Sequence, residues 1–360
     1  MNNILIAFFA SCISTILIIH TQKFHQHFTG DFLLDGPQKF HTHSVPRIGG
    51  IGVAIGISIA IFFCTRGDSD QSFEYVLLFC ATPVFIIGLA EDFSKRISVK
   101  TRLLFTAIGA LLATITLGAQ IPRLDILGID YLLTFPTVSI LLTIFAITGV
   151  SNAYNIIDGF NGLSSMVAII TLVALGYVSI ILGDGLLASL SFIMASAVTG
   201  FFICNYPRGL IFLGDCGAYL IGFWVATLSV LVVSRNSEVS PWFALLINGY
   251  PVLETLFTIY RRKIHQGKNP GQPDGIHFHS LIFRRILHSK VPKHKNEWFS
   301  ANAKTSPYLW ILATLTIVPG ALFWQDTTIL IAFFMLFTLT YVWLYRRIVS
   351  FRTPSWMRIG

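Results

Sequence analysis

The apolar residues of this chain fall in repeated blocks, and this pattern limits what the chain can fold into. Each block holds roughly 16 to 20 residues, which is about long enough to cross a hydrocarbon layer of about 30 Å as an α-helix. Only 12% of the residues are charged and the mean hydropathy is +0.70, whereas soluble domains carry about 25% charged residues. The pattern therefore predicts an all-α, polytopic membrane helix bundle.

Eleven spans are predicted, and the basic residues between them orient the chain. The spans are expected at residues 3–19, 47–64, 75–90, 102–119, 136–152, 163–182, 186–204, 214–233, 241–260, 307–324 and 328–345. An odd number places the termini on opposite sides. If the N-terminus lies outside, 22 of the 25 Lys and Arg residues fall on the inner side. The positive-inside rule then predicts an N-out, C-in topology.

The whole chain, residues 1–360, is expected to form one integral membrane domain, because no internal repeat or long polar domain is evident. The first apolar block lacks a basic leader and a small-residue cleavage site, so we expect it to be retained as a span. The five cysteines form no C-x-x-C pair, which argues against a metal cluster or a disulfide framework. The net charge is +8, and the basic residues responsible for it flank the apolar spans. We therefore interpret it as a topology and lipid-headgroup signal rather than as a nucleic-acid site.

The acidic residues gather in the segments predicted to face the cytoplasm. These residues are Asp35, Glu91, Asp92, Asp158, Asp215 and Asp274. We therefore expect the chemistry to reside in the inner loops near 20–47, 91–102, 152–163, 205–217 and 261–306.

The strongest single motif is NAYNIIDGFNGL, which lies between two apolar spans. Asn152, Asn155 and Asp158 are spaced by three residues, so they would share one face of a continuing helix. Carboxylate and amide oxygens suit a hard cation such as Mg²⁺, which takes its remaining ligands from water and substrate phosphate. An ordinary Asn/Asp/Gly turn between two helices is the alternative.

Two inner segments combine cations with carboxylates near the membrane boundary. In DGPQKFHTHSVPRIGG, the side chains of Lys39, His41 and Arg47 are candidates for holding phosphate oxygens, unless the segment is only a basic flank. Glu91 and Asp92 are adjacent carboxylates at the end of the third span. Such a pair needs a cation or exchanges protons, although basic neighbours in the same loop offer ordinary partners.

Three further segments carry carboxylate or histidine side chains. Asp215 lies between glycines at the start of the eighth span, where it is either an N-cap or a ligand. Glu254 lies inside the ninth span, and the sequence leaves open whether its contact is structural or functional. The segment PDGIHFHSLIFRR places His277, His279 and Arg284 together, and phosphate contact explains them better than zinc, because no further Cys or His cluster has zinc spacing.

With these motifs in this order, the chain resembles the polyprenyl-phosphate N-acetylhexosamine-1-phosphate transferases, the family that includes WecA, the O-antigen initiators and MraY. The resemblance spans roughly residues 30 to 290 and rests on VPRIGG, the acidic pair at 91–92, NAYNIIDGFNGL, LGD at 213–215 and the PD-x-x-H-x-H loop at 273–279. The first of these motifs and the eleventh span look more like the WecA branch than the MraY branch.

The resemblance implies that undecaprenyl phosphate attacks the β-phosphorus of a UDP-N-acetylhexosamine, in a magnesium-dependent reaction that releases UMP. Mn²⁺ is an alternative metal. Asp215 and Asn155 are implied as metal ligands, Asp158 as a residue that positions the nucleotide, and His277 and His279 as diphosphate contacts. Asp92, with Glu91 beside it, is implied to assist the attacking lipid phosphate. The remaining implied substrate-binding residues are Lys39, His41, Arg47, Asn152, Asn161 and Arg284.

Three residues depart from the family pattern. Glu91 stands where Asp is usual, Asn161 replaces a second Asp in DGxDG, and Ser280 replaces a third histidine. A phospho-N-acetylmuramoyl-pentapeptide transferase and a sugar or lipid transporter are the alternative functions. The expected location is a bacterial inner membrane, with the site on its cytoplasmic face. The sequence leaves open which hexosamine is used, which glycan is built, whether a covalent intermediate forms and whether the protein is a homodimer.

Overall fold

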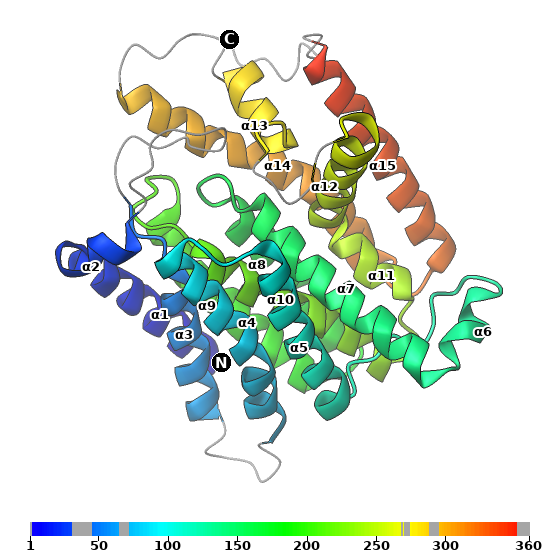
Figure 1. Ribbon diagram of the computed structural model, residues 1–360. Coiled ribbons are helices and arrows are strands. Elements are labelled where there is room, and N and C mark those ends of the chain that lie inside the picture. Colours follow the sequence, from blue (N-terminus) through cyan, green and yellow to red (C-terminus); the bar gives the residue numbers. More distant parts are fainter. Residues whose placement is uncertain are drawn as a thin grey trace.

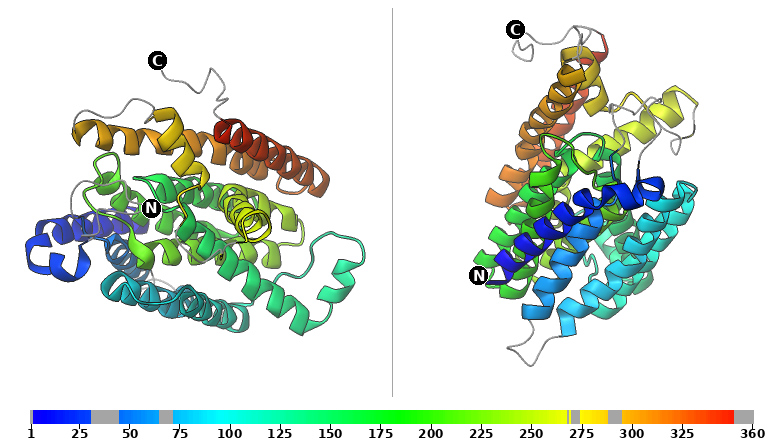
Figure 2. Two further views of the ribbon diagram at one scale, coloured as in Figure 1. Left: turned by 45° about the horizontal axis from the view of Figure 1, so that its top comes forward. Right: turned by 90° about the vertical axis from the view of Figure 1, so that its left-hand side faces the viewer.

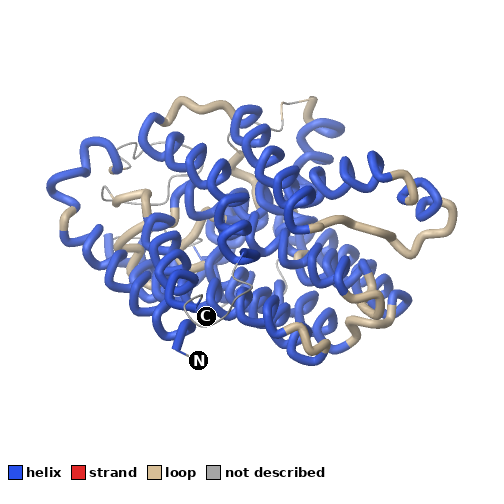
Figure 3. The backbone as a smooth tube through the Cα atoms, turned by 90° about the horizontal axis from the view of Figure 1, so that it is seen from below, coloured by secondary structure: helices blue, strands red, loops and turns tan. Residues whose placement is uncertain are grey.

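The computed structural model describes residues 2–30, 45–64, 72–267, 269, 274–287 and 295–350. Within these ranges every regular element is a helix, and a single isolated bridge joins Gly30 and Pro46 (Figure 3). The predicted all-α class is therefore confirmed.

Nine helices in the described ranges are long and apolar enough to cross a membrane. They are α1 (Asn2–His20), α4 (Ser72–Ser94), α5 (Val99–Leu117), α7 (Pro136–Ile157), α8 (Leu163–Ile181), α9 (Gly185–Asn205), α10 (Gly214–Arg235), α14 (Lys295–Leu322) and α15 (Thr327–Val349). The other predicted spans correspond to a shorter helix, α3 (Gly49–Cys64), and to a bent pair, α11 (Pro241–Ile247) and α12 (Gly249–Tyr260). The remaining short elements are α2 (Gln22–Thr29), α6 (Ile129–Leu133), η1 (Arg261–His265), α13 (Phe278–Ile282) and η2 (Phe283–Leu287).

The ninth predicted span is broken rather than straight, with a bend of 76° between its two parts. Pro251 has no N–H to donate to the carbonyl of Ile247, which precedes it by one helical turn. The hydroxyl of Thr171 donates to that carbonyl instead (3.4 Å). At the break, the Asn248 amide donates to the carbonyl of Ala244 (2.9 Å). Pro251 therefore accounts for the missing backbone hydrogen bond at the break, and the side chains of Thr171 and Asn248 form hydrogen bonds with the carbonyls there.

Helix α10 forms the centre of the bundle. All of its apolar window is buried inside the protein, and it packs against α7, α4 and α3 (Figure 1). The contact with α7 is close: the hydroxyl of Ser151 on α7 donates a hydrogen bond to the backbone carbonyl of Tyr219 on α10 (2.9 Å). The N-terminus of α10 is therefore held on several sides by other helices.

The helices follow a simple order across the bundle. Both views in Figure 2 show the N-terminal helices, including α1 and α3, on one side and the C-terminal pair α14 and α15 on the other. Successive spans run up and down, so α3 and α10 begin, and α4 and α7 end, at the same end of the bundle. The described parts of the predicted motif loops therefore meet at one end of the bundle.

Candidate active site

The VPRIGG and LGD segments are far apart in the chain but are joined by backbone hydrogen bonds. The N–H of Gly49 donates to the carbonyl of Phe212 (2.9 Å). The N–H of Gly50 donates to the carbonyl of Leu213 (2.8 Å). A Cβ atom at Gly50 would overlap the backbone of Gly217. Only glycine therefore lets α3 begin directly against the first turn of α10.

Asp92, near the end of α4, holds the N-terminus of α10. Its Oδ1 accepts a hydrogen bond from the N–H of Asp215 (2.8 Å), and its Oδ2 accepts one from the N–H of Cys216 (2.9 Å). The first N–H groups of a helix have no partner within that helix, and the helix dipole favours a negative charge there. Asp92 is only 2% exposed. Both carboxylate oxygens of this predicted catalytic residue therefore hold the first turn of α10, which carries Asp215.

The carboxylate of Asp215 is the centre of a polar cluster. It forms an ion pair with Arg102, and its Oδ1 lies 3.6 Å from Nη2 of Arg47. The side-chain amide of Asn155 donates to the same Oδ1 (3.2 Å). The Arg102 guanidinium also lies over the ring of Tyr219, 5.8 Å from its centroid. The structure therefore brings together the two predicted metal ligands and one predicted substrate-binding arginine.

Asp158 caps the end of α7 beside this cluster, and its backbone N–H donates to the carbonyl of Asn155 (3.2 Å). Burial raises the pKa of the Asp158 carboxyl to about 8. The charge of Arg47 opposes this rise, whereas the charges of Asp215 and Asp92 add to it. Carboxyls with strongly shifted pKa values are typical of functional sites. Asp158 is therefore largely protonated at neutral pH until a cation compensates its charge.

Replacing Asp158 with Asn is expected to raise the unfolding temperature of chelator-treated protein at about pH 9 and to leave it unchanged at about pH 4. The folded protein keeps a proton on Asp158 that the unfolded chain releases above about pH 4. Folding stability therefore falls as the pH rises from about 4 to about 8. Asn does not ionise, so the variant avoids this fall. The measurement is thermal unfolding in detergent across the pH range, and parallel curves for the two proteins would contradict the assignment.

The loop after Asp158 is held by helix α14. The N–H of Asn161 donates to Oδ1 of Asn302 (3.0 Å), and its carbonyl accepts from the hydroxyl of Ser306 (2.6 Å). The side-chain amide of Asn161 donates to the carbonyl of Pro207 (3.2 Å). The predicted role of Asn161 in substrate binding stays a prediction, and the structure gives this residue a role in holding the loop.

The histidine loop is tied to the end of α12 through Asp274. Its carboxylate accepts from Arg261, and its Oδ1 lies 3.7 Å from Nη1 of Arg262. Burial alone would raise the pKa of Asp274, but the hydrogen bond from Arg261 and the charge of His277 outweigh burial and lower it. Asp274 therefore stays anionic and anchors the start of the loop.

His279 connects this loop with the loop of Asp158. Its ring stacks on His277 (5.1 Å between centroids) and meets Phe160 edge-on (5.4 Å). A Cβ atom at Gly159 would lie 3.0 Å from Nε2 of His279. Burial, together with the positive charge of His277, lowers the pKa of His279 to about 3. His279 is therefore neutral near pH 7, and the two loops form one continuous site.

The other predicted residues occupy different places. Oε2 of Glu91 accepts from the N–H of Ile97 (2.6 Å) and so shapes the loop after α4. Oδ1 of Asn152 accepts from the hydroxyl of Tyr219 (2.9 Å), next to Arg102. Arg284 is exposed in η2. Two predicted substrate-binding residues, Lys39 and His41, lie outside the described residues.

Arg102 and Tyr219 are site residues that sequence reasoning missed. Arg102 lies in the first turn of α5, where a cation meets the positive end of the helix dipole, and a nearby acid offsets this repulsion. Tyr219 follows Asp215 by four residues on a helix, so both side chains face the same side. The spacing on α10 is a local signal for Tyr219, whereas the acid that Arg102 meets is identified only by the tertiary structure.

The chemistry of the residues around Asp215 fits a magnesium ion. The amide nitrogen of Asn155 contacts the Asp215 carboxylate, and the two side chains together carry carboxylate and amide oxygens, which are hard ligands. The described residues contain no group of three His, Cys, Asp or Glu side chains arranged to hold a metal. Mg²⁺ commonly uses one or two carboxylates and completes its shell with water and phosphate oxygens. The small protein donor set therefore suits Mg²⁺ better than a metal enclosed by protein side chains.

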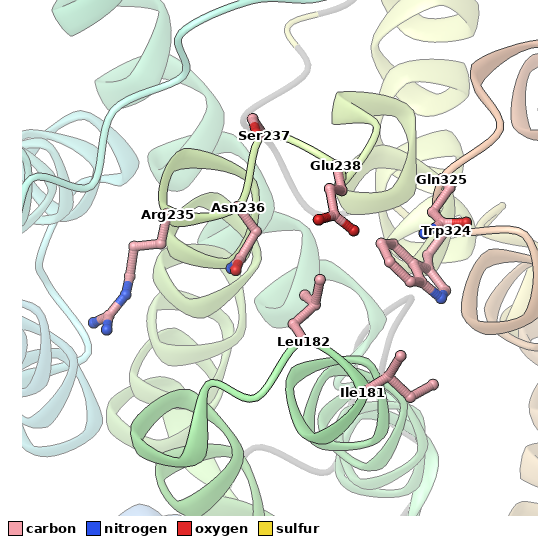
Figure 4. Close-up of a pocket in the computed structure, with 8 residues that line it drawn as sticks. All are labelled: Ile181, Leu182, Arg235, Asn236, Ser237, Glu238, Trp324 and Gln325. Carbon is pink, nitrogen blue, oxygen red and sulfur yellow. The ribbon is translucent and has the colours of Figure 1, made fainter.

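A separate cavity of about 360 Å³ lies at the opposite end of the bundle. It is lined by Ile181, Leu182, Arg235, Asn236, Ser237, Glu238, Trp324 and Gln325. Figure 4 shows Arg235 turned away from Glu238 and Trp324, and its Nε lies 3.0 Å from Oδ2 of Asp184. None of the motif residues lines this cavity, so it is not the candidate active site.

Comparison with known proteins identifies relatives of the chain. A family model described as glycosyl transferase family 4 matches residues 75–233. An undecaprenyl-phosphate alpha-N-acetylglucosaminyl 1-phosphate transferase of Salmonella typhi is 30% identical over 261 residues, covering 70% of this chain and 69% of that protein. The protein of the same name in Escherichia coli (strain K12) is 29% identical over 261 residues, with the same coverage. A probable undecaprenyl-phosphate N-acetylglucosaminyl 1-phosphate transferase of Bacillus subtilis (strain 168) is 25% identical over 292 residues, 78% of each chain.

Fold and relatives together define a multi-pass membrane enzyme with a polar site at one end of its bundle. The chain belongs to glycosyl transferase family 4, and the resemblance drawn from its five motifs is confirmed. The matched segment carries Asp92, Asn155, Asp158 and Asp215. The histidine loop and helices α14 and α15 lie beyond this segment, and the structure places them against it through contacts such as those of Asn161 with Asn302 and of Phe160 with His279.

Proposed function

We propose that this protein transfers N-acetylhexosamine 1-phosphate from a UDP-linked donor to undecaprenyl phosphate. An oxygen of the lipid phosphate attacks the β-phosphorus of the donor. The bond from that phosphorus to the bridging oxygen breaks, and UMP leaves with this oxygen, so the product is undecaprenyl diphosphate sugar. The contact of Asp215 with Asn155 and two arginines, beside the histidine loop, carries the proposal. The printed names of the relatives support this acceptor and an N-acetylglucosamine-type donor.

Different residues of the site would bind the metal ion, the phosphates and the nucleotide. Asp215 and Asn155 would hold Mg²⁺, or Mn²⁺ in its place, and the bound ion would supply positive charge to the diphosphate. Arg47 has a partly exposed side chain (32%) and is placed to meet phosphate oxygens. Arg102 is less exposed (14%) and keeps Asp215 compensated and oriented. Asp158 would position the nucleotide.

The histidine loop and Asp92 complete the proposed chemistry. His277 would contact the diphosphate, while His279, which is neutral near pH 7, would offer a hydrogen bond rather than a charge. Asp92 keeps its proposed role of assisting the lipid phosphate, in addition to holding the N-terminus of α10. In this arrangement alignment of the two phosphates is the main task.

We further propose that the site faces the cytoplasm of a bacterial inner membrane, with the N-terminus outside. The concentration of 22 of the 25 Lys and Arg residues on the side of the motif loops supports this orientation. The product would start the assembly of an O-antigen or a similar envelope glycan. This assignment rests on the relatives and on the motif pattern.

The function is tested by UMP release from purified protein with undecaprenyl phosphate, Mg²⁺ and a panel of UDP-sugars. We expect release with one UDP-N-acetylhexosamine and incorporation of its radiolabel into lipid. A chelator should abolish release, because the protein offers too few ligands to retain the ion alone. Added Mg²⁺ should restore it, and Mn²⁺ should restore it at least in part.

Two outcomes of this experiment separate the alternatives. Release that requires UDP-N-acetylmuramoyl-pentapeptide would assign the chain to the other branch of the family. Folded protein that releases no UMP with any donor, while passing an intact sugar through a vesicle membrane, would replace the enzyme by a transporter. Chelator-resistant release would reject the metal site.

A further inference from the structure

Glu254 is a buried carboxylate that joins three elements outside the Asp215 cluster. Its Oε1 lies 3.1 Å from Nδ1 of His277 and accepts the N–H of Phe278 (3.1 Å). Its Oε2 accepts the hydroxyl of Tyr341 (2.7 Å). Glu254 belongs to α12, His277 and Phe278 to the start of α13, and Tyr341 to α15, and these helices lie together in Figure 1. A side chain that is 1% exposed and has three donors is built to stay charged.

The contact with Glu254 requires a hydrogen on Nδ1 of His277. A carboxylate only accepts hydrogen bonds, so an unprotonated Nδ1 at 3.1 Å would place two acceptors against each other. The hydroxyl of Thr258 also lies near Nδ1 (3.2 Å) and can accept as well as donate. Nδ1 therefore carries a hydrogen. This leaves Nε2, which lies 4.0 Å from Oδ2 of Asp274, as the nitrogen available to a substrate.

We propose that Glu254 and Tyr341 are positioning residues for His277, and that α15 is thereby part of the catalytic apparatus. The inference rests on the proposed function, in which His277 meets the diphosphate. Helix α15 supports the same loop twice more. The hydroxyl of Tyr345 donates to the carbonyl of Ile276 (3.1 Å), and Arg285, just after α13, donates to the carbonyls of Ile348 (2.9 Å) and Val349. Glu254 orients the ring, and α15 holds both Glu254 and the loop.

Other charged groups also face His277, and they remain unchanged in the test. Asp274 lies on the side of Nε2, and Arg261 and Arg262 compensate its charge. His279 stacks on one face of the ring and is neutral near pH 7. A change at Glu254 therefore alters the one carboxylate that faces Nδ1.

Replacing Glu254 with Gln keeps the shape and the acceptor oxygen but removes the charge. We expect kcat for UMP release to fall about 10- to 100-fold, with KM for the donor changed by less than about threefold. The ¹⁵N shifts of the His277 ring should also change in this variant, because the Gln amide can donate to an unprotonated Nδ1 as well as accept from a protonated one. A merely structural role would lower the yield of folded protein and leave kcat per folded protein unchanged.

Tyr341→Phe is the second variant, because it removes one hydroxyl and preserves volume. We expect kcat to fall about 5- to 10-fold from the loss of a hydrogen bond to a charged group. Tyr177→Phe is the matched control, since Tyr177 is 48% exposed on α8. It should keep wild-type kinetics. Wild-type kcat in both Glu254→Gln and Tyr341→Phe would overturn the proposal.

A spectroscopic measurement decides the orientation independently of turnover. Protein labelled with ¹⁵N-histidine reports the protonation of each ring nitrogen, and His277→Gln identifies the resonances of His277. We expect Nδ1 to be protonated in the wild type across about pH 6 to 9. An unprotonated Nδ1 would overturn the proposal even if transfer activity is normal. Protonated Nδ1 in a protein that transfers no sugar would reject only the proposed function.

Discussion

Asp215→Asn is expected to reduce UMP release by more than about 10³-fold while the protein remains folded. The change removes the one carboxylate that meets Arg102, Arg47 and Asn155 together. The proposed metal site loses its only charged ligand, and such electrostatic stabilisation is worth several kcal/mol at a transferring phosphorus. The measurement is UMP release per folded protein, together with Mn²⁺ affinity by electron paramagnetic resonance, and both should fall.

Asp184→Asn is the matched control for this prediction. Asp184 is also ion-paired, since its Oδ2 lies 3.0 Å from Nε of Arg235, but it lies at the opposite end of the bundle. It caps α9 by accepting from the N–H of Leu187 (3.1 Å), and Asn caps a helix about as well as Asp. Its activity should therefore match the wild type. Wild-type turnover in Asp215→Asn, or equal losses in both variants, would remove Asp215 from the site.

Asp92→Asn is expected to lower UMP release by about 10²-fold, to weaken Mn²⁺ binding and to lower the unfolding temperature by several degrees. An amide has one acceptor oxygen, so its NH₂ group would face one of the two backbone N–H groups at the start of α10. A buried donor left without a partner costs about 1–3 kcal/mol. The start of α10 would shift, and Asp215 would move with it.

The three measurements on Asp92→Asn distinguish two roles of this residue. If Asp92 acted only by assisting the lipid phosphate, turnover would fall while Mn²⁺ affinity and the unfolding temperature stayed at wild-type values. That combination would contradict the positioning role inferred from its hydrogen bonds. Combined losses would support it.

Several features of the site were predictable because they depend on local sequence. Asn155 and Asp158 follow one another at helical spacing, and the structure places both at the end of α7 beside Asp215. Asp92 and Asp215 were predicted at the same membrane boundary, and the carboxylate of Asp92 accepts a hydrogen bond from the backbone N–H of Asp215. Alternating spans return every second loop to one end, which explains this success.

Other features were not predictable because they depend on distant partners. Glu91 and Asp92 are adjacent in the sequence, but Glu91 bonds to Ile97, whereas Asp92 bonds to α10. The substrate role of Asn161 stays a prediction, and the sequence did not indicate that its side chain donates to Pro207. In both cases a tertiary contact decides the role, since a polar side chain at a buried helix end binds the nearest unsatisfied backbone group.

The sequence by itself determined the class of the protein, its apolar spans and the gathering of its motifs at one end. These properties follow from local composition, because a bilayer requires about 20 apolar residues for each helical crossing. Only the tertiary structure decided which polar side chains meet. Arg102 pairs with Asp215, and Glu254 contacts His277 and Tyr341. Those pairings depend on which helix ends lie in contact. Close approaches such as that of Gly50 to Gly217 set these contacts, and no local pattern contains them.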